Sequence, residues 1–582
     1  MQRNSNNPVL KKIVLFPVLL LLIADLTHAQ SAYEDVDGAA YDLVNRLSTL
    51  SGELPQAIHT TVQPLDKKSV AGFMEQAAQY NTRRGWTQTD NANIGLALSN
   101  AGEWAAPDGF GAIDSRRPAG PFYQKITDLA YYNNRDFFIS ANPVLGFQGI
   151  YENADEATDF KYNIAAGAKV RAKYKDYVGL DLNIRYIREQ PVSYYEALNN
   201  SRNTLVGGPR NYNYNSEEQS YSYLLPTGNI SVSLLRDYIS LNLGYDYLKL
   251  GDGYRGLVLS DFAAPVAYAN IRTKVWKLQY DNIFMKLNPD TNIPGNALTN
   301  VQPNYKFATA HQLSVNLTKW LNVGAYEMVV FSRENGFEMG YLNPIIFYRA
   351  IERGLGSPDK VTIGINAKAI AAKGLRFYGQ FLLNEFTAKE FFAGNGYIHN
   401  KWGAQLGLNY YDAFNISNLD LQLEGNVIRP YTFQHIDRGE GYVAANFTNN
   451  NLPLGHPLAA GFREAIFIAT YRPAKNITLE AKAMFYQHGV DTGGLNLGND
   501  PSKDYSKNYP ADHGIKMVNG PKLTRLLGSL HASYQIAPNL FFALGGVYGN
   551  FNYAALPANN SSHYHIYSGI RLNLAHRDYT KI

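Results

Sequence analysis

The sequence predicts an all-β transmembrane barrel of about 18 antiparallel strands, with long extracellular loops and a small N-terminal periplasmic part that contains short helices. Three observations predict this fold. Apolar and polar residues alternate in many short segments, the mature chain has no apolar run of about 18 residues that would suit a membrane-spanning helix, and short and long connections alternate between the segments. Together they exclude a helical membrane protein and favour a barrel over a soluble sheet.

The alternation is clearest in the segment 237–265, DYISLNLGYDYLKLGDGYRGLVLSDFAAP. One face of its strand carries Ile239, Leu241, Leu243, Tyr245 and Tyr247, and the other carries Ser240, Asn242, Gly244 and Asp246. Aliphatic residues followed by tyrosines on the same face are typical of a lipid-facing strand with an interfacial aromatic girdle. The Gly-rich residues that follow do not turn back until about Pro265, so we expect a loop on the outer face.

About eighteen segments from residue 136 onward share this strand pattern. They begin near residues 136, 160, 177, 228, 237, 269, 277, 309, 321, 361, 375, 401, 418, 462, 476, 522, 539 and 563. Tight connections such as Trp276-Lys277 alternate with long ones such as 190–227 and 432–461. Transmembrane barrels have short periplasmic turns and longer extracellular loops, so the alternation predicts the orientation.

An even number of strands places both ends of the barrel chain on the periplasmic side. The last predicted strand, Tyr567 to Leu574, is similar to the C-terminal signal by which the barrel-assembly machinery recognises its substrates. A polar tail, His576 to Ile582, follows that strand, whereas many barrels stop at an aromatic residue.

The N-terminal region has a different character. Residues 1–29 have a basic start, an apolar stretch and a small-residue site, Thr27-His28-Ala29, as in a cleaved secretory signal peptide. Residues 30–134 form a predicted periplasmic segment before a barrel at 135–582. Within it, two amphipathic helices are predicted, one around Leu43 to Leu50 and one from Asp66, which is a candidate N-cap. Loop with one further helix completes the segment, which we expect beneath the barrel or in its mouth. The plainer alternative is a loosely ordered leader.

The composition narrows the function. The 582 residues include no cysteine, which excludes disulfides, cysteine metal sites and thiol catalysis. The net charge of +4 is close to balanced for this length and does not indicate nucleic acid. Neither H-E-x-x-H nor G-x-S-x-G is present. We therefore expect no enzyme, no metal and no cofactor.

One motif resembles a nucleotide site. Gly251 to Gly256 matches G-x-G-x-x-G, but the residues after it do not form the helix that would hold a pyrophosphate. A loop role is favoured. The acidic residues Asp181, Glu327, Glu424 and Glu480 are interpreted as inward-facing partners of Arg and Lys, and His563 with His565 as a polar cluster in the lumen.

Dense groups of aromatic and charged residues lie in the predicted loops. Aromatic rings stack on sugar rings, and Arg or carboxylate groups bond hydroxyls and acidic sugars, so these groups suit carbohydrate. The plain alternative is that they pack the long loops on one another. The candidate polysaccharide-binding residues are Tyr254, Arg255, Arg333, Tyr348, Arg349, Arg429, Tyr431 and His435.

Five stretches together resemble a known family. They are 251–265, Tyr341-Leu-Asn-Pro-Ile-Ile-Phe-Tyr-Arg349, Tyr378 to Phe386, Ile428-Arg-Pro-Tyr-Thr-Phe-Gln-His435 and Gly455-His-Pro-Leu458. The chain from about residue 130 is similar to the capsule-assembly Wzi family and, within it, to the RemB-type gliding-motility branch. The resemblance implies an eighteen-stranded outer-membrane barrel that acts as a surface lectin for capsular polysaccharide or exopolysaccharide. It supplies no fixed set of ligand residues.

Two functions remain open at this stage. The first is a cell-surface protein of the outer membrane that binds or anchors polysaccharide, with a gliding or secretion apparatus as a further partner. The second is a sugar-specific porin, since a barrel of about 16–18 strands is wide enough for an aqueous channel. Both are embedded in outer-membrane lipid, and neither binds nucleic acid.

Overall fold

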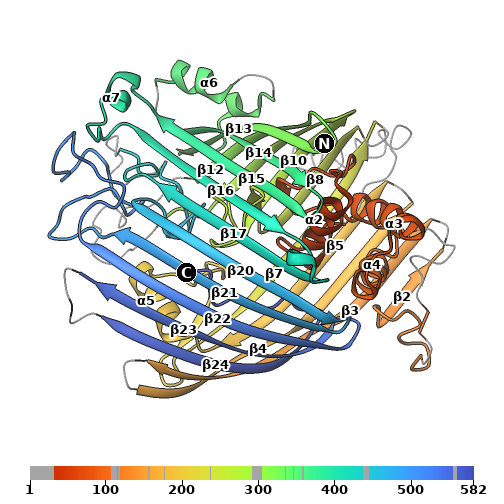
Figure 1. Cartoon of the computed structure of the whole chain (residues 1–582). Coiled ribbons are helices and arrows are strands. Elements are labelled where there is room, and N and C mark those ends of the chain that lie inside the picture. The colour runs from red at the N-terminus through yellow and green to blue at the C-terminus, as the bar shows by residue number, and fades with distance from the viewer. Residues whose placement is uncertain are drawn as a thin grey trace, which may run out of the picture.

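The computed structural model describes residues 32–582 except 106–113, 116–117, 135, 155–156, 176, 236–237, 291–304, 335, 345–346, 357–358, 437–444, 555–556 and 558–559. The signal peptide expected at 1–29 lies outside the described residues. Within them, 18 antiparallel strands close into a barrel when β24 pairs with β3 (Figure 1). The strands are β3 (Phe137–Ala154), β4 (Ala157–Tyr174), β5 (Val178–Glu189), β7 (Ser220–Leu234), β8 (Ile239–Asp246), β10 (Val266–Val275), β11 (Leu278–Leu287), β12 (Tyr305–Asn316), β13 (Leu321–Arg333), β14 (Lys360–Ala372), β15 (Leu375–Glu385), β16 (Lys401–Tyr410), β17 (Leu419–Ile428), β20 (Phe462–Ala474), β21 (Ile477–Gly489), β22 (Lys522–Ala537), β23 (Leu540–Tyr553) and β24 (Ser561–Leu572).

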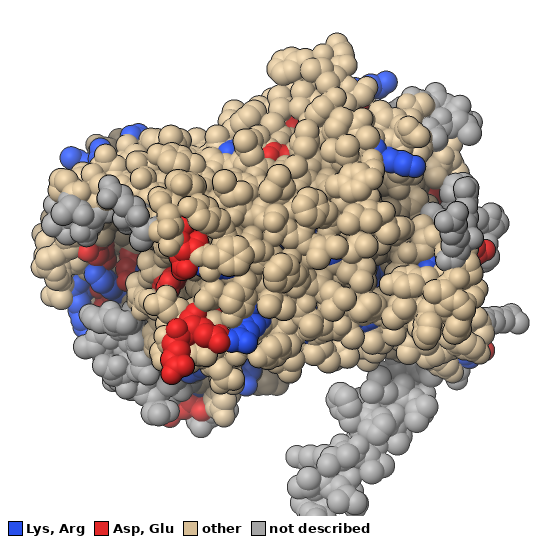
Figure 2. Space-filling view, turned by 90° about the horizontal axis from the view of Figure 1, so that it is seen from below, with Lys and Arg blue, Asp and Glu red and all other residues tan. Residues whose placement is uncertain are grey.

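The predicted alternation holds along the strands because successive side chains point to opposite faces of a sheet. In β8, Leu243 is 42% exposed on the outer wall, whereas its neighbour Asn242 is 2% exposed. The outer wall carries many exposed apolar side chains, such as Ile365 and Leu530. Charged side chains are sparse over the middle of the wall seen in Figure 2 and more frequent towards its left-hand end. This apolar belt is the surface that a lipid bilayer requires.

The predicted strand boundaries agree closely with the observed ones. The largest difference is in β7, which was expected near residue 228 and begins at Ser220. Short turns, such as the one at Trp276 and Lys277, join the strands at one end, which we call the short-turn end. The longer connections meet at the opposite, long-loop end. Two short strands, β2 (Ala130–Asn133) and β6 (Asn213–Asn215), extend the ladder by pairing with β3 and β7.

The connection between β8 and β10 corrects one expectation. It was predicted to lie on the outer face, but it folds into the barrel, where Leu257, Val258 and Leu259 belong to the largest apolar cluster. The same cluster contains inward side chains of the wall, such as Met328, and Phe447 from the long connection between β17 and β20. That connection includes the small hairpin of β18 (Thr448–Asn449) and β19 (Leu452–Pro453). The described part of the interior is therefore a packed core.

Close packing also explains the glycines of the nucleotide-like motif. A Cβ built on Gly253 would lie 2.5 Å from side-chain oxygens of Gln405 and Glu424 on the wall. A Cβ on Gly256 would lie 2.3 Å from the Leu259 carbonyl oxygen. Real Cβ atoms do not approach other atoms so closely, so glycine is required for the loop to lie against the wall. This agrees with the interpretation of the motif as a loop.

The N-terminal segment forms α2 (Ala39–Ser51) and α3 (Lys67–Arg84), as the apolar spacing predicts. The third helix, which the spacing did not locate, is α4 (Gln88–Asn100). Asp66 caps α3, since its carboxylate accepts a hydrogen bond of 2.8 Å from the Ser69 N–H. The helices lie at the short-turn end (Figure 1), where the Gly374 N–H donates to the Thr49 carbonyl. No helix among the described residues is long and apolar enough to cross a membrane.

Both ends of the described chain enter the barrel. Between α2 and α3, β1 (Val62–Gln63) pairs with β9 (Lys249–Leu250) of the inward loop. The polar tail after β24 was expected on the periplasmic side, but it turns back into the interior. There Tyr194 of α5 (Ser193–Arg202) donates a hydrogen bond of 2.6 Å to the Tyr579 carbonyl. The tail and the N-terminal segment thus add to the filling of the barrel.

Candidate functional site

The eight residues selected from the sequence do not form one site. The structure places them in three separate regions: the barrel interior, the outside of the wall, and the long-loop end. Tyr254 and Arg255 lie in the interior. Arg333 is the last residue of β13, and Tyr348 and Arg349 belong to the connection between β13 and β14, which lies against the outside of the wall. Arg429, Tyr431 and His435 lie in loops at the long-loop end.

Arg255 is enclosed by the interior and holds it together. Its guanidinium Nη2 donates to Oε1 of Glu464 at 3.0 Å, and Nη1 donates to the Lys581 carbonyl at 2.7 Å. Glu464 is fully buried and also lies 2.8 Å from Nε2 of His456. The Arg255 side chain is 4% exposed. A soluble ligand at the long-loop end does not reach the Arg255 guanidinium. In the structure, Arg255 holds the interior together.

Tyr254 lies in the same layer of the interior and contacts the tail. Its hydroxyl donates a hydrogen bond of 2.7 Å to Oδ2 of Asp578, which also accepts one of 2.7 Å from Nζ of Lys482. Burial raises the pKa of the Asp578 carboxyl, but Lys482 and the hydrogen bonds lower it more, so that the pKa lies well below its usual range. The carboxylate is therefore ionised in the folded protein and fixes the tail.

The second group packs on the outer wall. Arg333 forms two hydrogen bonds of 2.8 Å to the carboxylate of Asp359. The Tyr348 ring is buried against the ring of His311, with centroids 3.9 Å apart. Arg349 is exposed, and its Nη1 donates to Oε2 of Glu352 at 2.9 Å. Arg333 and Tyr348 therefore attach the connection to the wall, whereas the Arg349 side chain pairs within the connection itself.

Glu327 corrects the interpretation of the acidic residues. Asp181 and Glu424 are buried acids of the interior, as expected, but Glu327 lies on the outer face of β13. Its carboxylate accepts hydrogen bonds from the N–H groups of Tyr348 (2.6 Å) and Arg349 (2.9 Å). The sequence pattern shows which residues share a face of the strand. Here a covering loop supplies hydrogen bonds to an acidic residue on the outer face.

The third group organises the long-loop end. Tyr431 is fully buried, and its hydroxyl donates to the Asn496 carbonyl at 2.8 Å. A Cβ on Gly498 would lie 2.6 Å from the Tyr431 ring, and its φ of 89° also suits glycine. Arg429 donates from Nη2 to the carbonyl of Tyr397 at 3.3 Å, and burial lowers its pKa. His435 is buried, and its main chain forms an isolated parallel β-bridge with that of Asp504. These residues are supports for the loops above them.

Above these supports lies a cluster of four rings, which we call the ring cluster: Tyr397, His399, Tyr505 and His513. The ring centroids of Tyr397 lie 5.2 Å from those of His399 and 5.1 Å from those of His513. His399 and Tyr505 meet edge to face at 5.9 Å. His513 is exposed, and the other three rings are partly exposed. The two contributing connections are joined by main-chain hydrogen bonds, such as the one of 2.8 Å from Ile398 to Asp512.

Opposite charges flank the ring cluster. Oε1 of Glu385 accepts a hydrogen bond of 2.8 Å from Nζ of Lys401, and Oε2 lies 2.8 Å from Nδ1 of His399. The Lys401 ammonium lies 3.5 Å from the centroid of the Tyr505 ring. Lys401 is fully buried and holds the Glu385 carboxylate and the Tyr505 ring in place. The rings can stack on a ligand ring, and Glu385, whose side chain is 31% exposed, can accept hydrogen bonds from ligand hydroxyl groups.

None of the four residues of the ring cluster was selected from the sequence. Its members come from connections more than a hundred residues apart, and each is a single aromatic residue in a polar stretch. The motif Ile428 to His435 was a partial signal, because Arg429 and Tyr431 bond the connections that carry the rings. The density of aromatic and charged residues therefore indicated residues that support the loops carrying the rings.

No family model matches the chain, and no curated protein sequence does. Among solved structures, the chain is similar to Wzi of Escherichia coli, an outer-membrane protein involved in group 1 capsule assembly and described as a carbohydrate-binding β-barrel. The TM-score is 0.53 at 11% identity, over 94% of this chain and 100% of that one. The likeness is one of fold. OprD of Pseudomonas aeruginosa is also similar, with a TM-score of 0.40 at 11% identity, over 74% of this chain and 95% of that one.

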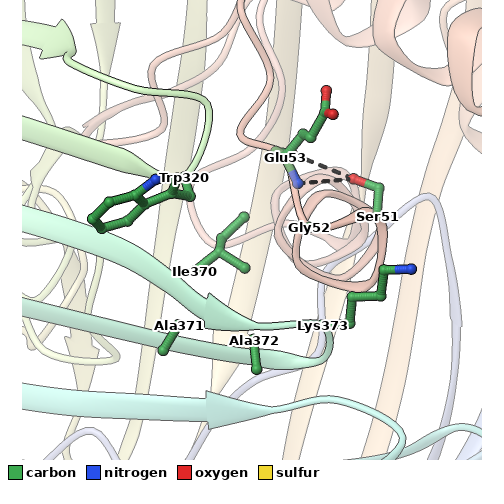
Figure 3. Close-up of a pocket in the computed structure, with 8 residues that line it drawn as sticks. All are labelled: Ser51, Gly52, Glu53, Trp320, Ile370, Ala371, Ala372 and Lys373. Atoms are coloured by element: carbon green, nitrogen blue, oxygen red, sulfur yellow. Dashed lines mark hydrogen bonds between the residues drawn. The ribbon is translucent and has the colours of Figure 1, made fainter.

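A cavity of about 550 Å³ lies at the opposite, short-turn end (Figure 3). It is lined by the end of α2 and by two short turns of the barrel. The lining residues are Ser51, Gly52, Glu53, Trp320, Ile370, Ala371, Ala372 and Lys373. Trp320 is its one aromatic ring, and Figure 3 shows the side chains of Glu53 and Lys373 apart from that ring. The cavity therefore lacks the combination of clustered rings and paired charges that the long-loop end has.

The described residues do not group three or more His, Asp or Glu side chains in a way that could hold a metal ion. His563 and His565 of the last strand are buried and pack against the Tyr194 ring. The centroid of that ring lies 4.4 Å from the centroid of His563 and 6.2 Å from that of His565. The sequence analysis expected a polar cluster in the lumen at this position. The structure gives these histidines aromatic neighbours there.

Proposed function

We propose that this protein is exported to the outer membrane and binds or anchors capsular polysaccharide or exopolysaccharide through the ring cluster at its long-loop end. The observation that carries the proposal is the set of four rings beside the Lys401–Glu385 pair, on the side of the barrel opposite the N-terminal helices. Sugar rings stack on aromatic faces, and the partly exposed Glu385 carboxylate can accept hydrogen bonds from sugar hydroxyl groups. No enzymatic step is part of the proposal.

The packed interior supports binding over transport. A sugar-specific porin needs a polar, water-filled path. In the described residues the interior contains an apolar cluster that joins Leu257 and Phe447 to the wall residue Met328. The tail and the N-terminal segment occupy further space. Nothing in the described residues therefore supports the porin alternative. We expect planar-bilayer recordings of the intact protein to show no steady conductance.

The similar fold of the carbohydrate-binding capsule-assembly barrel agrees with this proposal. The sequence resemblance to the gliding-motility branch adds a second biological readout, the spreading of cells on a surface. In that setting the protein would couple surface polysaccharide to a gliding or secretion apparatus. The barrel itself would be inserted by the barrel-assembly machinery after the signal peptide is removed.

The direct test is binding of the purified surface polysaccharide to the protein in nanodiscs. Replacing Tyr397 and His513 with alanine removes a half-buried ring and an exposed one. We expect a loss of about 2 kcal/mol, or roughly 30-fold in affinity, because a few central anchors dominate such interfaces. Tyr238→Ala is the matched control, since Tyr238 is an exposed tyrosine of the short-turn end. Unchanged binding by the folded double variant would refute the site.

A cell-based assay tests the function independently of the site. Cells that lack the protein should shed polysaccharide into the medium or lose the ability to spread. The Tyr397→Ala, His513→Ala variant should reproduce that phenotype while it still shows heat-modifiable migration in gels. A deletion strain with normal retention and normal spreading would refute the polysaccharide function as well as the site.

A further inference from the structure

The outer face of β12 and β13 is unusually polar for a wall that contacts lipid. Antiparallel pairing places His311 opposite Glu327, and Thr309 opposite Val329, on the same face. Their neighbours Tyr326 and Met328 belong to the interior cluster, so this face points outward. A bare carboxylate and imidazole in the middle of a lipid-facing wall would be costly.

A protein segment covers this polar region. We call the described residues 336–344 and 347–356, between β13 and β14, the wall flap. It includes η3 (Met339–Leu342) and α6 (Tyr348–Gly354), and Figure 1 shows α6 outside the ring of strands. The rings of Phe337, Tyr341 and Tyr348 form an apolar cluster with Val329 and Phe331 of the wall.

Polar contacts fix the wall flap at several points. Glu327 accepts hydrogen bonds from the first N–H groups of α6, which need partners outside the helix. The Tyr280 hydroxyl of β11 donates to the Pro344 carbonyl at 2.6 Å. At the long-loop end, Tyr341 donates to Asp359 at 2.6 Å, and Arg333 pairs with the same carboxylate. The flap is thus a built part of the wall.

The other side of the wall flap is apolar and exposed. Phe347 is 76% exposed and Met339 is 70% exposed, and Leu342 and Leu355 are exposed as well. On β12 and β14, Leu313, Ile363 and Ile365 of the lipid-facing belt are also exposed. The apolar surface of the flap therefore continues the belt. Two basic residues of α6, Arg349 and Arg353, are exposed beside these apolar residues, whereas its acidic residue Glu352 is buried.

We propose that the wall flap is an interfacial anchor embedded in the outer leaflet, where Phe347, Met339, Leu342 and Leu355 contact acyl chains and Arg349 and Arg353 bind the phosphate groups of anionic lipid. An amphipathic segment with bulky apolar residues and basic residues at its edge has the composition of membrane-interface segments. Arginine matches phosphate geometry. In water, four large apolar side chains would remain hydrated, whereas continuity with the lipid-facing belt places them in acyl chains. The proposal is independent of the polysaccharide function.

Fluorescence quenching tests the embedding, because the chain contains no native cysteine. Phe347→Cys is labelled with an environment-sensitive dye and reconstituted in vesicles of phosphatidylcholine and phosphatidylglycerol. Ile365→Cys reports the lipid-facing wall, and Ala511→Cys reports the exposed long-loop end. We expect doxyl-labelled lipid to quench the Phe347 label as strongly as the Ile365 label, with protection from iodide. Strong iodide quenching without doxyl quenching, as at Ala511, would overturn the proposal.

A second measurement addresses the headgroup. Doxyl-labelled phosphatidylglycerol should quench the Phe347 label several-fold more than doxyl-labelled phosphatidylcholine at equal mole fraction. In the Arg349→Gln, Arg353→Gln variant this preference should disappear while quenching by the neutral lipid remains. Both arginines are exposed, and Gln at position 349 keeps an N–H donor for the buried Glu352, so the variant should fold. An unchanged preference would refute phosphate binding, and a label that is shielded from both lipid and iodide would instead indicate a protein partner and refute the lipid anchor.

Discussion

Replacing Arg255 with alanine should destabilise the barrel interior strongly while leaving the ring cluster intact. The Arg255 guanidinium neutralises Glu464, whose carboxylate is fully buried and would keep only His456 and Asn426 as partners. Breaking a buried ion pair by removing one partner costs about 3–5 kcal/mol, because an uncompensated charge remains in a medium of low polarity. This corresponds to a factor of roughly 100 to 4,000 in the unfolding equilibrium.

Urea unfolding of the protein in lipid vesicles, followed by tryptophan fluorescence, measures this loss. Arg463→Ala is the matched control, since Arg463 adjoins Glu464 on β20 but is exposed, and it should cost less than about 1 kcal/mol. Arg255→Met combined with Glu464→Gln should recover most of the stability because no unpaired charge remains. A cost near zero for Arg255→Ala, together with weaker polysaccharide binding, would mean that Arg255 contacts ligand and would refute our account of the interior.

Three further predictions concern the wall, the orientation and the tail. Leu243→Arg should cost about 2–4 kcal/mol in folding assays because it puts a charge near the centre of the lipid-facing wall, whereas Leu243→Ala should cost much less. An epitope inserted between Gly493 and Gly494 should bind antibody on intact cells, and one at Lys475 only after the outer membrane is opened. The pKa of Asp578 is lower in the folded state than in the unfolded state, so its contribution to tail docking is complete at neutral pH and is lost as the pH falls below about 4. Hydrogen exchange of the tail, corrected for intrinsic rates, should reveal that release, and Asp578→Asn should weaken docking already at pH 7.

The strands could be predicted because alternation with a period of two is a local property of the sequence. The content of the interior could not, since inward polar residues suggest water when the chain is read one strand at a time. Asn242, for example, is buried and donates a hydrogen bond of 3.0 Å to the Tyr268 hydroxyl. The apolar run Leu257 to Leu259 was interpreted as part of a surface loop, because only its distant partners show that it is core.

The candidate site was predicted less completely than the fold, for the same physical reason. Arg429 and Tyr431 lie in one recognisable stretch, so they could be selected from the sequence, and they support the loops, Tyr431 fully buried and Arg429 half-buried. Tyr397 and His513 form a candidate site only because two connections that are distant in sequence meet in the fold. Glu327 was assigned to the wrong face because an acid on the outer wall requires a covering segment from elsewhere in the chain.

The inward loop between β8 and β10 has a consequence for how the protein must fold. Asp252 of this loop accepts hydrogen bonds of 2.6 and 2.8 Å from Thr60 and Thr61 of the N-terminal segment. A few residues later, Tyr254 and Arg255 bind the tail beyond β24. The first and last described parts of the chain are thus joined through one loop from its middle. Contacts so distant in sequence form slowly, and the interior can be complete only once the tail beyond β24, the last strand of the barrel, has docked on this loop.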